Sequence, residues 1–197
     1  ADHIGGVEEL ALVDRYVKKQ KANLVITDEF KELLWNESLK GGLKVNEEGP
    51  LNIDDYFNQI KPELLQTQPF EMFETNVGSI NLKLFRTNHV VCQATGDFQI
   101  SYGVLIDDKV LYPCDTQFNR GQLEYLIGKY PVKVIFHDCD ISGYSEGVHA
   151  SYAQLKTLPD EIKAMTYLCH YNGKAESINP AEDGFRKFAK PGVWYRC

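Results

Sequence analysis

Apolar positions follow a helical period at the start of the chain and an alternating, strand-like period further on. Between residues 4 and 20, Val7, Leu10, Val13 and Val17 recur at helical spacing with charges between them, which predicts an amphipathic helix. A β-rich run follows at 22–27, and Thr27-Asp28 can cap a second helix that carries Phe30, Leu33 and Leu34. Residues 38–52 contain a Gly-Gly and a Gly-Pro pair among polar residues and predict a loop.

The rest of the chain predicts strands first, and strands alternating with helices later. Residues 54–65 are ambiguous, with a short helical turn as one interpretation. The predicted strands are 70–74, 80–86, 100–106, 110–112, 132–136 and 165–169, and 193–195 is apolar. The predicted helices are 121–129, 150–158 and 181–190. Asp107-Asp108-Lys109 joins two of the strands as a hairpin. This order predicts one α/β domain over residues 1–197, with helices covering a sheet.

Composition narrows the classes of function. The 197 residues carry a formal net charge of −7, which argues against a long nucleic acid as substrate because such proteins usually present a basic patch. No run approaches 18 apolar residues, so we expect no membrane span, and no signal peptide is visible. The five cysteines include no CxxC pair and predict reduced thiols in a cytoplasmic protein, with metal binding as the less favoured alternative. They are Cys92, Cys114, Cys139, Cys169 and Cys197.

Polar residues with metal-binding chemistry recur where the predicted strands end. His89, Asp115, His137-Asp138 and His170 each follow such a strand, and His149 precedes a predicted helix. Loops on a rigid sheet are where catalytic groups concentrate. Each residue alone has a structural alternative, because buried histidines are usually satisfied by hydrogen bonds and Asp115-Thr116 could be an ordinary turn or helix cap. The agreement of several in sequence order favours a site.

These residues carry a resemblance to a known superfamily. The opening Asp2-His3-Ile4-Gly5-Gly6 resembles the second half of the His-x-His-x-Asp-His-x-Gly-Gly signature of the metallo-β-lactamase superfamily. His89 matches that superfamily's third histidine motif. Asp115-Thr116 resembles its Gly-Asp-Thr motif, with Cys114 where glycine is usual. Further segments resemble the phosphodiesterase branch, which includes ribonuclease Z; they are His137-Asp138-Cys139, His149-Ala150-Ser151 and Leu168-Cys169-His170-Tyr171. Within this branch, the anti-Pycsar proteins, which hydrolyse cyclic nucleotides, are the most similar.

The resemblance implies an α/β fold of the metallo-β-lactamase αββα sandwich type, truncated at its N-terminus so that the first strands and the His-x-His are missing. It also implies two divalent metal ions, Zn²⁺ or alternatively Mn²⁺, which together can clamp both oxygens of an in-line phosphoryl displacement. By this resemblance, Asp115 bridges both metals. His89 belongs to the first metal, and Asp2, His3 and His170 belong to the second. His149, oriented by Asp138, is the expected catalytic proton donor, and His137 is expected to be structural.

The predicted function is hydrolysis of a small cyclic nucleotide at a dinuclear metal centre in a cytoplasmic homodimer. A ribonuclease Z-like RNA endonuclease is the first alternative, but residues 38–65 are acidic where that activity needs a basic insertion. A non-catalytic fragment that keeps the fold is the second. Because two histidine ligands would lie ahead of Asp2, we expect this chain to bind metal weakly and to be impaired as an enzyme.

Overall fold

The computed structural model describes residues 3–142, 147–171 and 173–195. The chain divides into two compact units, Ala1–Glu63 and Leu64–Cys197, and each is described by itself. The expectation of one metallo-β-lactamase-fold domain over residues 1–197 stays a prediction. Within the described residues, no helix combines the length and the apolar character needed to cross a membrane.

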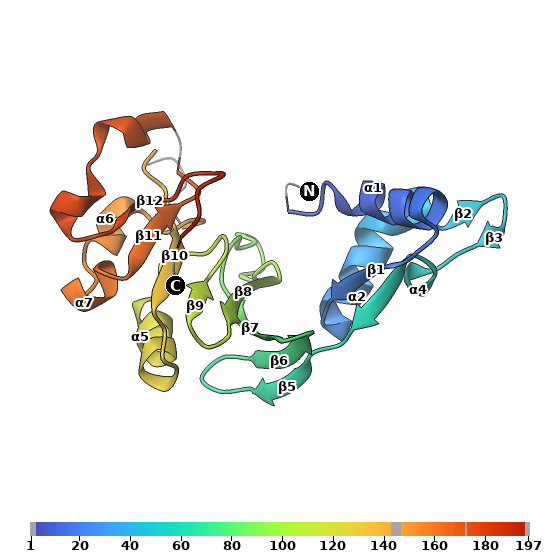
Figure 1. Ribbon diagram of the computed structural model, residues 1–197, viewed down its shortest axis with the longest axis horizontal. Coiled ribbons are helices and arrows are strands. Elements are labelled where there is room, and N and C mark those ends of the chain that lie inside the picture. The colour runs from blue at the N-terminus through green and yellow to red at the C-terminus, as the bar shows by residue number, and fades with distance from the viewer. Residues whose placement is uncertain (1–2, 143–146, 172, 196–197) are drawn as a thin grey trace. The chain divides into compact units, whose positions relative to one another are not determined.

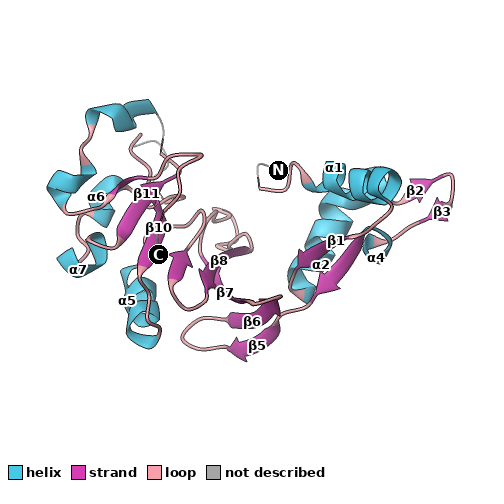
Figure 2. Cartoon of the chain, viewed as in Figure 1, coloured by secondary structure: helices cyan, strands magenta, loops and turns pink. Residues whose placement is uncertain are grey.

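The first unit is mainly helical, with a short two-stranded parallel sheet (Figures 1 and 2). Its helices are α1 (Val7–Leu12), the π-helical η1 (Val13–Lys18), α2 (Asp28–Leu34), the π-helical η2 (Trp35–Leu39), α3 (Lys40–Leu43) and α4 (Ile53–Tyr56). Its strands are β1 (Ala22–Val25), β2 (Val45–Asn46), β3 (Gly49–Pro50) and β4 (Phe57–Ile60). β1 pairs with β4. The predicted cap of α2 is confirmed, because the Thr27 side chain accepts a hydrogen bond from the Phe30 amide at 3.3 Å.

The prediction of a loop over residues 38–52 was wrong in its first half. η2 and α3 continue the helical path to Leu43, and only then does the short β2–β3 hairpin begin. Leu39 and Leu43, one helical turn apart, are 4% and 1% exposed in the core of this unit. Their burial outweighs the low helix propensity of the Gly41-Gly42 pair. The ambiguous residues 54–65 form parts of α4, β4 and β5.

The second unit is built on a large mixed sheet with the strand order β12-β11-β10-β9-β8-β7-β6-β5 among the described residues. Its strands are β5 (Glu63–Gln66), β6 (Met72–Val77), β7 (Ile80–Thr87), β8 (Ser101–Ile106), β9 (Val110–Tyr112), β10 (Val134–Asp138), β11 (Thr166–Cys169) and β12 (Lys187–Phe188). Strands β6 to β9 form an antiparallel meander, whereas β9 to β12 pair in parallel. The prediction of an α/β architecture is confirmed at this level.

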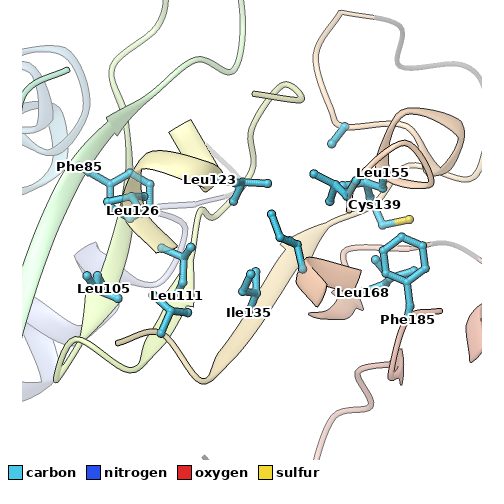
Figure 3. Packing of buried hydrophobic residues seen from close by; sticks show 14 of the residues in the cluster. Phe85, Leu105, Leu111, Leu123, Leu126, Ile135, Cys139, Leu155, Leu168 and Phe185 are labelled. Carbon is cyan, nitrogen blue, oxygen red and sulfur yellow. The ribbon is translucent and has the colours of Figure 1, made fainter. Parts of the chain in front are cut away.

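Helices pack on this sheet through one apolar cluster. They are α5 (Arg120–Lys129), α6 (Tyr152–Leu155) and α7 (Asp160–Lys163), followed by the 3₁₀ turns η3 (Gly173–Ser177) and η4 (Pro180–Asp183). Figure 3 shows the cluster, in which Leu123 and Leu126 of α5 join Leu111 of β9 and Ile135 of β10. All four side chains are at most 3% exposed. The second unit therefore has a core of its own, on which the strand ends are held rigidly.

The predicted helix over residues 181–190 was wrong. The segment begins in the 3₁₀ turn η4, which is capped at its C-terminus by Gly184 with φ 92°. The chain then continues into the edge strand β12. Phe188 lies in β12 opposite Leu168 of β11 and is 8% exposed. Pairing with β11 and burial of Phe188 decide the conformation, because tertiary contacts override the weak helix propensity of so short a segment.

Candidate metal and hydrolase site

The predicted site residues of the second unit follow strands that end at the same edge of the sheet. β9, β10 and β11 are parallel, and Leu111, Ile135 and Thr166 lie in one row. β7 runs in the same direction as β9, because both are antiparallel to β8. The residues that follow the carboxyl ends of these strands therefore meet at one edge, where α/β proteins usually place their ligands. They are His89 after β7, Asp115 after β9, Asp138 at the end of β10 and His170 after β11.

Asp138 is the buried centre of this edge. Its side chain is 1% exposed, and its Oδ2 accepts hydrogen bonds from His149 Nδ1 at 2.6 Å and from the Thr116 amide at 3.0 Å. A carboxylate can only accept here, so His149 carries its proton on Nδ1. The other oxygen, Oδ1, lies 3.2 Å from His170 Nδ1 but has no hydrogen-bond partner among the described residues. A buried carboxylate oxygen without a hydrogen bond is unusual, and it indicates a site where a cation or a proton belongs.

Three imidazole rings line the edge beside this carboxylate. The ring centroids of His89 and His149 are 4.8 Å apart, and those of His149 and His170 are 4.7 Å apart and stacked. His170 Nε2 lies 3.4 Å from Asp115 Oδ2. One ligand atom each from Asp115, His149 and His170 falls within 4.8 Å of the others, which is compatible with a shared cation. One carboxylate and two imidazoles form a donor set that suits zinc.

Two of the turns that present these groups have left-handed backbone. Cys114 has φ 58° and His170 has φ 56°. Apart from glycine, few residues adopt this conformation; asparagine, aspartate and histidine do so more often than cysteine, and such residues cluster at functional sites. At Cys114 the φ value explains why glycine is the usual residue before the aspartate in the motif that this segment resembles. The backbone turns sharply there to bring Asp115 onto the edge.

Comparison with known proteins identifies the family. The family model described as "Anti-Pycsar protein Apyc1" matches residues 1–195. The chain belongs to this family. Its relatives include Anti-Pycsar protein Apyc1 of Bacillus phage vB_BsuM-Goe3, 34% identical over 202 residues, which cover 98% of this chain and 73% of the relative. Anti-Pycsar protein Apyc1 of Paenibacillus xerothermodurans is 31% identical over 178 residues, covering 90% of this chain and 66% of the relative.

A solved structure, unliganded yeast PDE1, aligns with 82% of this chain and 53% of its own. The TM-score is 0.47 and the sequence identity is 16%. A likeness at this level carries no argument about activity.

Not every predicted ligand lies in the part of the chain that forms this edge. Asp2 lies outside the described residues, and His3 belongs to the first unit, in the turn before α1. Their ligand roles stay predictions. His137 is not part of this cluster of ligand atoms. Its side chain is 1% exposed, its Nδ1 lies 2.7 Å from the backbone oxygen of Asp138, and burial lowers its pKa. These contacts are those of a structural histidine, as expected from the sequence.

Two residues of this Apyc1-family site were given no role from the sequence, although Thr116 belongs to the Asp115-Thr116 motif. The Thr116 amide binds Asp138, and its hydroxyl donates to the Asn88 carbonyl at 3.1 Å. Gln117 donates its side-chain amide to the carbonyls of His89 and Gly147. They are the next two residues after Asp115, and this position in the sequence is the feature that could have indicated them. No residue pattern indicates which distant carbonyl groups their side chains reach.

The cysteines beside the site do not join the groups of candidate metal-ligand atoms found among the described residues. Burial, together with the nearby carboxylates of Asp115 and Asp138, raises the pKa of Cys114 to about 12. Burial and the same two carboxylates raise the pKa of Cys169 to about 12 as well. Burial also raises the pKa of Cys139. Without a cation these three thiols therefore stay protonated at neutral pH, and the clustered carboxylates and imidazoles remain the favoured donors.

Cys92, on the exposed loop between β7 and β8, should be the most reactive of the described thiols. Hydrogen bonding from the Thr95 side chain lowers its pKa, so its thiolate fraction at pH 7–8 exceeds that of an unperturbed cysteine. We expect iodoacetamide to alkylate Cys92 before Cys114 and Cys169, as measured by peptide mass mapping over time. A Thr95→Val variant should slow Cys92 alone. Equal rates at Cys92 and Cys114 in the folded protein would contradict this order.

Proposed function

We propose that this Apyc1-family protein is a metal-dependent phosphodiesterase that opens the phosphodiester ring of a small cyclic nucleotide. The observation that carries the proposal is the cluster of Asp115, His149 and His170 beside the buried carboxylate of Asp138. The substrate class, a small cyclic nucleotide, is inferred from membership of the anti-Pycsar family and from the motifs that resemble it. The metallo-β-lactamase sandwich and a dinuclear centre are part of this proposal, as are a cytoplasmic location and a homodimer.

The residues at the sheet edge fit a divalent cation. The carboxylates of Asp115 and Asp138 lie 3.4 Å and 3.2 Å from the two ring nitrogens of His170. Asp115 is 5% exposed and Asp138 is fully buried, so little water stabilises their charges. Asp115 and His170 would hold the cation, with His89 completing the set after β7, and His3 and Asp2 are further candidates by resemblance. When bound, a divalent cation neutralises charge on the phosphoryl oxygens during displacement. The small, acidic chain is compatible with such a substrate because the cation supplies the local positive charge.

His149 and Asp138 supply the proton chemistry. The bond from His149 Nδ1 to Asp138 Oδ2 fixes the ring and leaves Nε2 as the nitrogen that exchanges a proton with substrate. Hydrolysis forms one P–O bond to the oxygen of a water and breaks one P–O bond of the ring. The leaving ribose oxygen takes a proton from His149 Nε2, a proton from the attacking water restores His149, and the product is a nucleoside monophosphate. Asp138 stabilises the protonated ring without touching the substrate, so it is a positioning residue.

Cleavage of a panel of 3′,5′-cyclic nucleotides tests the function. The substrates are offered to this chain with Zn²⁺ or Mn²⁺ in excess, and each reaction is repeated with a chelator. We expect metal-dependent cleavage that the chelator abolishes. A linear oligoribonucleotide is the comparison substrate. Its cleavage without cyclic-nucleotide cleavage would favour a ribonuclease Z-like activity, and no cleavage of either would favour a protein that has kept the fold without the chemistry.

Zinc titration separates ligand from proton donor. His149 lies close enough to Asp115 and His170 to be a third ligand, although we assign it the proton. We expect His170→Ala to weaken zinc binding at least about tenfold and His149→Ala to change it less than about threefold, by isothermal titration calorimetry. Equal losses in the two variants would make His149 a ligand. Two tightly held zinc ions in the wild-type chain would contradict the expected weak binding.

A further inference from the structure

Gln117 joins two loops that carry site histidines. Its side-chain Nε2 donates one hydrogen bond to the backbone carbonyl of His89, at 2.8 Å, and another to the carbonyl of Gly147. A primary amide has two N–H donors and here both are used. Its backbone amide donates a third bond, to the Asn88 carbonyl at 2.7 Å. One residue thus spans the ends of β7 and β9 and the loop that precedes α6.

The joined loops are also linked through the histidines themselves. His89 Nδ1 donates to the Val148 carbonyl at 3.1 Å, which places the ring of His89 against the backbone directly before His149. On the other side of Gln117, the Thr116 carbonyl accepts from the Ala150 amide at 2.8 Å. Thr116 and Gln117 therefore hold the segments 88–89 and 147–150 at a fixed separation. The 4.8 Å between the rings of His89 and His149 depends on that separation.

We propose that Gln117 is a positioning residue for hydrolysis, because its amide sets the spacing between His89 and His149. The inference rests on the proposed function and extends it to a residue without titratable chemistry. Gly147 has φ 79° and is exposed, so its own backbone offers little resistance to movement. Without the Gln117 amide, the two carbonyls lose their shared donor and the loop before α6 is held by fewer bonds. Displacements of about 1 Å can lower turnover by about 10²-fold.

Gln122 provides a matched control. Its Nε2 donates to the Arg86 carbonyl at 2.8 Å, so it has the same chemistry and also reaches β7. It is 8% exposed in α5, and these hydrogen bonds, from its side chain to Arg86 and from its backbone amide to Asn119, involve no histidine. A glutamine-to-methionine change at either position removes an amide and preserves the length of the side chain. Only the change at Gln117 should alter the spacing of the imidazoles.

The test compares Gln117→Met, Gln117→Glu and Gln122→Met in steady-state cleavage of the cyclic nucleotide that the wild-type protein prefers. We expect Gln117→Met to lower kcat about tenfold with KM within about twofold, and Gln117→Glu to lower kcat further because its oxygens face two carbonyls. Gln122→Met should lower the midpoint of thermal unfolding and leave kcat unchanged. An unchanged kcat in Gln117→Met, or an equal fall in both methionine variants, would overturn the proposal.

Hydrogen exchange distinguishes a failure of this inference from a failure of the proposed function. In the protein without substrate, we expect Gln117→Met to speed exchange about tenfold in peptides covering 147–151 and 88–100, and Gln122→Met to leave both unchanged. If no protein cleaves any cyclic nucleotide but this pattern is found, the linking role of Gln117 stands and the hydrolase function fails. Unchanged exchange in Gln117→Met would overturn the linking role whatever the activity.

Discussion

Replacing His149 by alanine is expected to lower cyclic-nucleotide turnover by about 10²–10⁴-fold, the usual range for a general acid. The ring is held at Nδ1 by Asp138 Oδ2 at 2.6 Å and stacks on His170, so it has one defined orientation at the sheet edge. Alanine removes the only proton donor that we assign to the leaving oxygen, whereas Asp115 and His170 remain. The measurement is kcat at saturating substrate and metal.

Asp138→Asn is the companion variant. Asparagine keeps the shape of the side chain, but an amide must satisfy both the Thr116 amide and His149 Nδ1 with one oxygen. We expect a loss of about 10–100-fold in kcat, smaller than that of His149→Ala. If His149→Ala retains more than about a third of wild-type kcat, the assignment of His149 as proton donor is wrong. For both variants, circular dichroism spectra that match the wild-type spectrum would exclude unfolding as the cause of the lower kcat.

The second large effect is expected in stability. Gly103 in β8 lies directly opposite Phe85 of β7, and a Cβ at this position would lie 2.3 Å from Phe85 Cζ and 2.8 Å from the Pro113 Cα. Phe85 is fully buried and packs edge-on against Phe70 at 6.4 Å, so its ring cannot move aside cheaply. Gly103→Ala should lower the free energy of unfolding by about 3 kcal/mol, at the upper end for overpacking. Urea denaturation measures it.

Gly128 offers a control of opposite sign. It lies in α5, where a Cβ added to it would meet nothing within 4 Å, and its backbone is helical and exposed. Gly128→Ala should raise the free energy of unfolding by about 0.5–1 kcal/mol, because alanine is the better helix former. Should Gly103→Ala and Gly128→Ala both fall within about 0.5 kcal/mol of wild type, the close approach of β8 to Phe85 would be disproved.

Sequence patterns predicted the second unit better than the first. Strands β7 to β11 were predicted within about two residues, because each is a short apolar run bounded by turn residues. Helix α5 was predicted for the same local reason, its apolar spacing. The failures were the loop assigned to 38–52 and the helix assigned to 181–190. In both segments the deciding contacts are tertiary: burial of Leu39 and Leu43 in one core, and pairing of β12 with β11 in the other.

For the site, the sequence by itself determined which residue types end the strands, and hence that carboxylates and imidazoles were candidates at one edge. Only the tertiary structure decided their partners. Asp138 and His149 are eleven residues apart, whereas Gln117 reaches His89 and Gly147 across 28 and 30 residues. Such contacts depend on strand register and on left-handed turns such as those at Cys114 and His170. A local sequence pattern can determine a helix or strand because the residues that form it are neighbours in the chain. The distance between two side chains far apart in the sequence is set by the packing of the whole sheet.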